Sequence, residues 1–330
     1  MFDREAFSEY VNGQSWYDKS RIGERMDDVA DFHVFLSRRG VRGVNDITGD
    51  DVSAYVSEMR ERSGDVYQTL LIIALYGEFL KNEELCSEVF LLFDAAGVMD
   101  RLSELTREHL GEEVWRKIFG DVKMPEIGWT LDEMSDFTRD IEKRFLLTVP
   151  REKYERVCVK NAHAWDPAWN GNEREEFLKM KSVDKFIEAR NDGFMKELEK
   201  FRDSGELFFS QAIDDEVIAY MRENPVCRRE GDKLIFTKIP FSAGKYLRET
   251  DAKMKRYYAC HCPWAKRSIL RGEPVSRSFC HCSLGHAKKS FDNAFGRELN
   301  GVIIETVLDG NGLKCVFEVG IPGDIMELYV

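Results

Sequence analysis

The chain has 330 residues, of which 43% are hydrophobic, and a formal net charge of −12, values typical of a soluble globular protein long enough for two domains. Its longest apolar run, Thr69 to Tyr76, is far too short to span a membrane, and eight cysteines are too few for a disulfide-stapled scaffold. Because Met1 to Tyr10 is acidic and mixed, unlike a signal peptide, we expect a reducing cytoplasmic setting. There, closely spaced cysteines favour metal binding or redox chemistry.

Helical patterns fill the first part of the chain. Apolar residues recur at helical spacing between Met26 and Leu36. Thr48, with Asp51 three residues later, has the pattern of a capping box and opens a second helix, which Ser63-Gly64 ends. The same spacing predicts further helices over residues 67–79, 86–93 and 102–118.

Short apolar motifs in these helices resemble a known family. They are Phe35-Leu36, Arg39-Gly40, Ile47-Thr48, Asp51-Val52, Tyr55, Tyr76 and Phe79-Leu80. The run from Phe32 to Leu85 is similar to the SAM-like core-binding domain of tyrosine recombinases of the phage-integrase type, which clamps DNA. No histidine here has arginine three residues later, as the catalytic domain of that family requires, and residues 24–110 carry nine basic against eighteen acidic side chains. Such a surface repels phosphates, so we do not expect DNA as a partner; a DNA-associated adaptor is the third functional hypothesis.

The middle of the chain is also mainly helical. A Pro- and Gly-containing stretch, Asp121 to Trp129, marks a boundary, and Thr130 with Glu133 forms a second capping box that opens a helix ending before Pro150. We interpret Asn161 to Asn172 as an ordered loop held by two tryptophans, with a lid over a ligand site as the alternative. Helices are predicted next over residues 173–202 and 214–224.

The last hundred residues are predicted to contain strands as well as helices. A strand is predicted at Lys233 to Lys238 and a helix at Ala243 to Tyr258. Two strands, Val302–Leu308 and Leu313–Gly320, flank Asp309-Gly310-Asn311-Gly312 as a hairpin, which places Cys315 on the second strand. The predicted fold is α+β: an all-helical N-terminal region, then an α/β module with a small antiparallel sheet and a C-terminal β-hairpin. The predicted units are residues 1–122, 123–230 and 231–330.

The strongest chemical signal is the tripeptide Cys-His-Cys, which occurs twice: in Cys-His-Cys-Pro at Cys260–Pro263 and in Cys-His-Cys-Ser at Cys280–Ser283. Each precedes a predicted helix, Trp264–Leu270 or Leu284–Phe295, whose N-terminus would favour a thiolate at Cys262 or Cys282. Residues i and i+2 of an extended segment point to the same side, so all four sulfurs can converge. We therefore predict a metal site of Cys260, Cys262, Cys280 and Cys282, with zinc as the expected ion, iron as its alternative, and His286 and Cys315 as reserve ligands. A redox pair, or reduced cysteines lining a core or pocket, remain open.

The motifs lie in the one basic region of an acidic protein. Residues 241–296 contain eleven Lys and Arg against four Asp and Glu. These cations are either a solvated helix face or a means of stabilising thiolates and attracting an anionic ligand. The residues concerned are Lys266, Arg267, Arg271, Lys288 and Lys289.

The tail resembles a second family. Gly285 near a helix start, then Gly301-Val302-Ile303-Ile304-Glu305 and Gly312-Leu313-Lys314-Cys315-Val316-Phe317, is similar to the 4-vinyl reductase-type domain over about Lys233 to Tyr329. That resemblance implies a small-molecule-binding α/β module, related in fold to heme-nitric-oxide-binding and Bet3-type proteins. A similar tail occurs in proteins resembling L-2-amino-thiazoline-4-carboxylic acid hydrolases. Val307 and Leu308 stand where the domain often has another cysteine.

These observations favour a cytoplasmic sensor-like protein that binds a small molecule or a metal. The predicted pocket suits an apolar or aromatic carboxylate and uses Trp264, Lys266, Arg267, Lys288 and Phe291. The alternative is a metal- or cysteine-dependent hydrolase of a small carboxylate, with His261 or His281 as general base. No membrane partner is expected, and a homodimer is compatible with the sequence.

Overall fold

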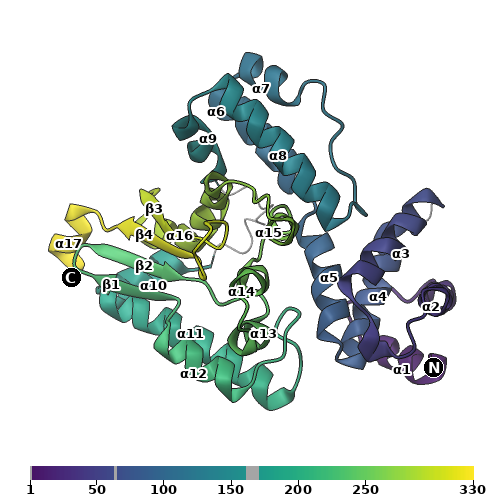
Figure 1. The fold of residues 1–330 in the computed structure, drawn as a ribbon. Coiled ribbons are helices and arrows are strands. Elements are labelled where there is room, and N and C mark those ends of the chain that lie inside the picture. Colours follow the sequence, from purple (N-terminus) through teal and green to yellow (C-terminus); the bar gives the residue numbers. More distant parts are fainter. Residues whose placement is uncertain (1, 63–64, 161–170) are drawn as a thin grey trace.

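A computed structural model describes residues 2–62, 65–160 and 171–330 (Figure 1). Helices occupy most of the chain and a small antiparallel sheet lies near its C-terminus, so the predicted α+β class is confirmed. The helices are α1 (Arg4–Gly13), α2 (Ile22–Arg38), α3 (Gly49–Glu61), α4 (Val66–Leu80), α5 (Glu83–Asp94), α6 (Val98–Leu110), α7 (Glu112–Phe119), α8 (Leu131–Thr148), α9 (Arg151–Cys158), α10 (Glu173–Met180), α11 (Val183–Ser204), α12 (Asp215–Glu223), α13 (Ala243–Arg248), α14 (Ala252–Ala259), α15 (Lys266–Arg271), α16 (His281–Phe295) and α17 (Gly323–Tyr329).

Both predicted capping boxes are confirmed. The Thr48 side chain accepts a hydrogen bond from the backbone N–H of Asp51 at the start of α3, and the Asp51 carboxylate accepts one from the Thr48 backbone. Thr130 and Glu133 do the same at the start of α8. Each pair satisfies backbone donors that the first helical turn leaves without partners.

Three helices predicted as continuous are interrupted. Gly111, at φ 87°, divides residues 102–118 into α6 and α7. Lys181 adopts a left-handed conformation and the Ser182 side chain caps α11, so residues 173–202 form two helices, not one. Glu249 has extended backbone and Asp251 caps α14, which splits the helix predicted at 243–258. Apolar residues recur on both sides of such breaks, so a helical spacing of apolar residues does not reveal them.

The sheet has the strand order β1-β2-β4-β3 and every pairing is antiparallel. Its strands are β1 (Cys227–Glu230), which we did not predict, β2 (Lys233–Thr237), β3 (Gly301–Glu305) and β4 (Val316–Gly320). Phe317 of β4 lies opposite Phe236 and Ile303 on the two flanking strands. These side chains form a buried core with Phe291 of α16.

The C-terminal hairpin is shorter than predicted. Its strands end at Glu305 and begin again at Val316, so a long loop from Thr306 to Cys315 replaces a tight turn. Cys315 therefore lies just before β4 and not on it, although its carbonyl accepts a hydrogen bond from the Lys238 backbone N–H.

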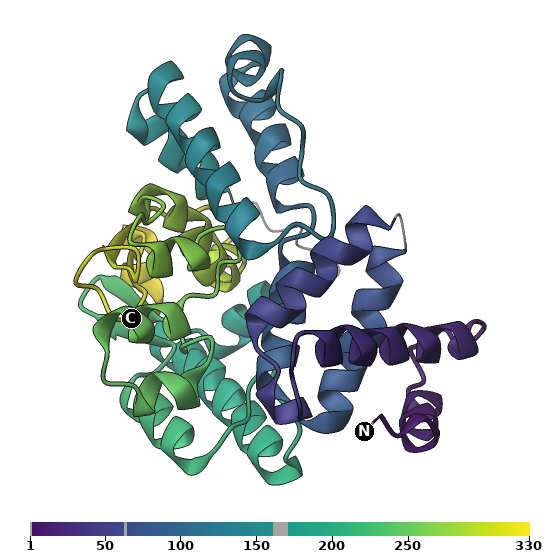
Figure 2. The same ribbon diagram turned by 45° about the vertical axis from the view of Figure 1, so that its right-hand side comes forward.

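The cysteine motifs lie where the helical and sheet-containing parts meet. One continuous buried cluster extends from Phe7 in α1 to Cys260, Cys282 and Leu308. α15, directly after the first motif, packs against α8, and Figures 1 and 2 show it between the N-terminal helices and the sheet. Most of the predicted loop at Asn161–Asn172, with its lid alternative, falls outside the described residues.

Candidate functional site

Three short segments carry the predicted metal ligands. Cys260 follows the last residue of α14 in extended conformation, and Cys262 lies two residues later. Cys280 ends a short 3-10 helix that runs directly into α16, and Cys282 is in the first turn of α16. Cys315, the reserve ligand, ends the loop that leads into β4.

Burial controls the ionisation of these thiols. It raises the pKa of Cys260 to about 11, and it raises the pKa of Cys262 and Cys280 well above the ordinary cysteine value. The helix N-terminus predicted to favour a thiolate at Cys262 lies further along the chain, since α15 begins only at Lys266, and burial is the largest influence on the pKa of Cys262. All eight cysteines are free of disulfides.

The sulfurs from the three segments form one cluster. Besides burial, charges on Cys315 and Cys260 raise the pKa of Cys280, and charges on Cys260 and Cys282 raise that of Cys262. The Thr306 hydroxyl links two segments, since its Oγ1 is 3.0 Å from Cys280 Sγ and 4.0 Å from Cys315 Sγ. The structure thus brings both motifs and the reserve cysteine together.

The second motif does not have the extended backbone that we assumed. Cys280 and His281 have helical backbone angles, and Cys282 belongs to α16. Side chains two residues apart on a helix point in nearly opposite directions, so Cys280 and Cys282 face different neighbours.

Cys158, at the end of α9, is a buried thiol that sequence reasoning missed. Burial raises the pKa of Cys158 well above its ordinary value, and the charge of Cys282 adds to this effect. Cys282 therefore lies near both Cys158 and Cys262, while Cys280 lies toward Thr306 and Cys315. Cys158 belongs to no motif, so no signal in the sequence associates it with the pair of Cys-His-Cys segments.

Two lysines flank the thiols. Lys266 is 2% exposed, and its Nζ donates a hydrogen bond to the Cys260 carbonyl over 3.1 Å. Burial lowers the pKa of Lys266 to about 8. The Nζ of Lys238 donates to Ser283 Oγ over 3.2 Å, and the charge of Lys238 acts on Cys260, Cys280 and Cys315. Sequence reasoning included Lys266 but missed Lys238, which precedes the basic region.

The histidines of the motifs bind backbone or carboxylate groups. His261 Nε2 lies 2.6 Å from the Ile239 carbonyl oxygen, and burial, with a smaller contribution from Lys238, holds the pKa of His261 well below its usual value. His286, the reserve ligand, lies close enough to His261 to lower that pKa further.

His281 lies near Ser278 and Glu155, but the hydrogen bonds among these three residues do not join a nucleophile to the imidazole. Its Nδ1 is 2.9 Å from the Ser278 carbonyl oxygen and its Nε2 is 3.9 Å from Glu155. The Ser278 hydroxyl donates to Glu155 over 2.7 Å, not to the imidazole. A nucleophile needs its base within hydrogen-bond reach, so Ser278 and His281 do not form a nucleophile–base pair.

The residues predicted to line one ligand pocket lie in separate parts of the structure. Trp264 is buried with its ring 6.0 Å from that of Phe137, and Phe291 packs in the separate core beneath the sheet. Lys288 is buried, with Nζ 2.5 Å from Asp292, and lines a surface cavity of about 540 Å³ beside α16. That cavity is lined by Val159, Lys160, Gly285, Lys288, Lys289, Asp292, Asn293, Gly296, Arg297 and Glu298.

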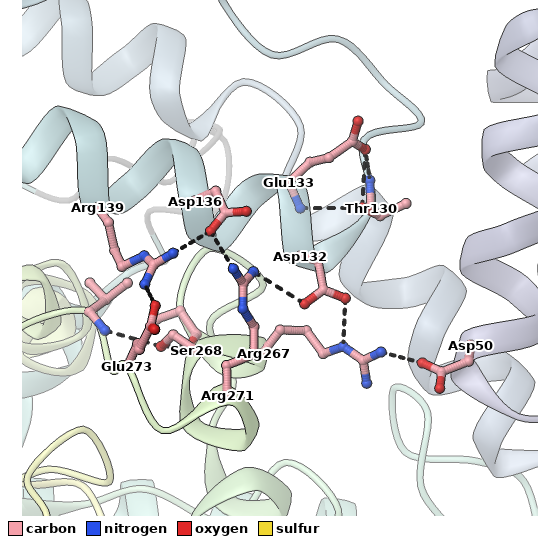
Figure 3. A network of polar contacts seen from close by, with 12 residues as sticks. Asp50, Thr130, Asp132, Glu133, Asp136, Arg139, Arg267, Ser268, Arg271 and Glu273 are labelled. Carbon is pink, nitrogen blue, oxygen red and sulfur yellow. Dashed lines mark hydrogen bonds and ion pairs between the residues drawn. The ribbon is translucent and has the colours of Figure 1, made fainter.

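Arg267, another predicted ligand residue, joins α15 to the N-terminal helices (Figure 3). Its guanidinium contacts Asp50 of α3, and its Nε is 3.2 Å from Asp132 of α8. Arg271 continues this contact, with ion pairs to Asp132 at 3.4 Å and Asp136 at 2.8 Å. Arg267 and Arg271 therefore act as connections between helices.

We expect Arg267→Ala to lower the free energy of unfolding by about 1 kcal/mol, since its acidic partners stay hydrated while its largely buried stem loses packing. Arg297→Ala is the matched control, because Arg297 and its partner Asp324 are both about half exposed and lie away from α15. Urea unfolding of both variants measures the difference. Equal losses of unfolding free energy in the two variants would show that the contacts of Arg267 between helices add no more stability than an ordinary surface ion pair.

Within residues 2–62, 65–160 and 171–330, no three His, Cys, Asp or Glu side chains are arranged as ligands of one metal ion. None of the helices described there is both long and apolar enough to cross a membrane. Comparisons with protein-family models, curated proteins and solved structures found no match to this chain. The two resemblances stay predictions, and a functional assignment must come from the chemistry of the thiol cluster.

Proposed function

We propose that this protein binds a thiophilic divalent metal ion, zinc or iron, through Cys260, Cys262, Cys280 and Cys315. The observation that carries the proposal is the convergence of thiols from three separate chain segments in one buried cluster. Thiolates are the soft ligands that zinc and iron take in proteins, and four of them complete a tetrahedral shell.

Cys315 replaces Cys282 in the proposed ligand set. Cys280 has Cys315 and Cys260 as its neighbours, whereas Cys282 lies on another side of α16, where it influences both Cys158 and Cys262. Because the side chains are not arranged as metal ligands, binding would draw the sulfurs together and displace their protons.

A closed shell of four thiolates leaves no position for a metal-activated water, so the proposal favours sensing over hydrolysis. The ion would join the segment after α14, the start of α16 and the loop before β4. Occupancy would therefore fix three elements relative to one another. This is how metal binding becomes folding free energy, and it gives a sensor its output.

The test is elemental analysis of protein purified without added metal. We expect about one zinc or iron per chain, and we expect its loss in Cys260→Ser, Cys280→Ser and Cys315→Ser. Cys282→Ser should retain the metal, which separates the ligand set proposed here from one containing both cysteines of the second motif.

Cys86→Ala and Cys227→Ala are the controls, since both side chains are buried away from the thiol cluster, in α5 and β1. They should keep wild-type metal content. Wild-type protein that holds no metal and takes up none of either ion would overturn the proposal. Metal loss in Cys282→Ser with retention in Cys315→Ser would restore the four ligands predicted from the sequence.

A further inference from the structure

A second cavity, of about 310 Å³, adjoins the cavity beside α16. Lys160 lines both cavities, so they lie next to each other. The second cavity lies where α6 and α8 end against α7 and α9, and volumes of this size are typical of small-molecule sites. Its described lining is apolar or basic: Leu110, Val114, Val149 and Val157, with His109, Lys153, Arg156 and Lys160.

Two helices turn basic faces toward the cavities. The lining residues of α9 and of the turn after it follow the spacing of one helix face: Lys153, Arg156, Val157 and Lys160. Those of α16 and its C-cap have the same spacing: Gly285, Lys288, Lys289, Asp292, Asn293 and Gly296. Because α9 and α16 also contact each other, the two basic faces border one region of the surface.

Carboxylates neutralise only part of this positive charge. The described residues that line the two cavities include six Lys and Arg but only two acids, Asp292 and Glu298. Lysines already engage both acids, since Asp292 lies 2.5 Å from Nζ of the buried Lys288 and Glu298 pairs with Lys160. In the described part of the chain, three cations of the lining have no carboxylate within ion-pair distance: Lys153, Arg156 and Lys289.

We infer that the adjoining cavities bind an organic molecule that carries two or more phosphate groups. Positive charge gathered in a hollow of a chain whose net charge is −12 attracts anions, and Lys and Arg are the side chains that bind phosphate. The phosphates would pair with Lys153, Arg156 and Lys289, and the apolar residues of the second cavity would cover the rest of the molecule. A single carboxylate, the ligand expected from the sequence, would leave most of these cations without a partner.

The test uses ADP as the probe in isothermal titration calorimetry, with pyrophosphate and adenosine for comparison. We expect ADP to bind more tightly than pyrophosphate, because only ADP can also cover the apolar lining. Adenosine, which lacks phosphate, should bind too weakly to measure. The affinity for ADP should fall as salt rises, because Lys153 and Arg156 are exposed and salt screens their charges.

Arg156→Gln combined with Lys289→Gln should lower the affinity for ADP about tenfold or more, because charge-assisted hydrogen bonds to phosphate are lost. Lys196→Gln combined with Lys200→Gln is the matched control. It removes the same charge, and both of its lysines are exposed on α11 and line neither cavity. The control should bind ADP as wild type does.

Thermal unfolding gives a second readout. ADP should raise the unfolding midpoint of wild type and of the control, and should have little effect on the variant that lacks Arg156 and Lys289. Should that variant fail to fold, Lys153→Gln takes its place, since Lys153 is exposed near the start of α9. An affinity of Lys153→Gln equal to that of the control would then contradict the site.

Three results would overturn the inference. Wild-type protein that binds no ADP at low salt would leave Arg156 as an ordinary cation in the last turn of α9. Pyrophosphate that binds as tightly as ADP would indicate a site for inorganic phosphate alone. Equal affinities in the Arg156 and Lys289 variant and its control would place ADP elsewhere. Among the described residues no cysteine lines either cavity, so these results do not depend on a metal ion at the thiols.

Discussion

Phe317→Ala is expected to lower the free energy of unfolding by about 3–5 kcal/mol, the largest effect of the substitutions considered for this protein. Phe317 is fully buried at the centre of β4, between Phe236 on β2 and Ile303 on β3. Alanine removes most of the ring and leaves a cavity that the paired strands cannot close without breaking their register. Chemical denaturation followed by circular dichroism measures the loss.

Val302→Ala is the matched control on the same sheet. Val302 lies on the edge strand β3 and its side chain is 52% exposed, so the substitution should change stability by less than about 0.5 kcal/mol. Similar losses in the two variants would mean that the sheet does not bury the face that contains Phe317.

Gly312→Ala is the second substitution with a large expected effect, and Gly310→Ala, in the same loop, is its control. A Cβ at Gly312 would lie 2.2 Å from the Thr306 carbonyl oxygen, whereas a Cβ at Gly310 meets nothing within 4 Å. The loop has little freedom to move, because the Glu305 carboxylate accepts hydrogen bonds from the backbone N–H groups of Leu313 and Lys314. We expect Gly312→Ala to cost about 2–3 kcal/mol, and Gly310→Ala to be close to neutral.

This pair of glycines also tests the candidate site. Displacing Thr306 would move its hydroxyl from Cys280 and shift the segment that ends at Cys315. Under the metal proposal, Gly312→Ala should therefore reduce metal content as well as stability, while Gly310→Ala should retain both. Unfolding midpoints and elemental analysis of the same samples give the two readouts. Reduced stability with full metal content would show that the loop does not position Cys315.

The thiol cluster is packed against the N-terminal helices, so a change at the thiols can affect that part of the protein as well. The cysteine motifs share a buried cluster with the N-terminal helices, and α15 contacts both regions through adjacent residues. Lys266 faces the first motif, while Arg267 pairs with Asp50 and Asp132. A rearrangement at the thiols therefore has a direct physical route to the helical part of the protein.

The sequence by itself determined the local structure wherever a local interaction sufficed. The capping boxes at Thr48 and Thr130 fixed the starts of α3 and α8, because their hydrogen bonds join residues only three positions apart. The strand at Lys233–Thr237 and the α+β class followed from short-range patterns in the same way. The helix breaks at Gly111 and Lys181 were missed, because the helical spacing of apolar residues does not show where one helix ends and the next begins in a new direction.

The doubled motif also located the candidate chemistry, but only the tertiary structure decided its form. Cys315 and Lys238 reach the thiols through the pairing of β2 with β4, a contact between segments about 80 residues apart in the chain. The helical start of α16 turned Cys282 toward Cys158, which no motif predicted. Burial raises the pKa of these thiols where a helix N-terminus alone would have lowered it, because desolvation depends on every element packed around a group and not on its neighbours in sequence.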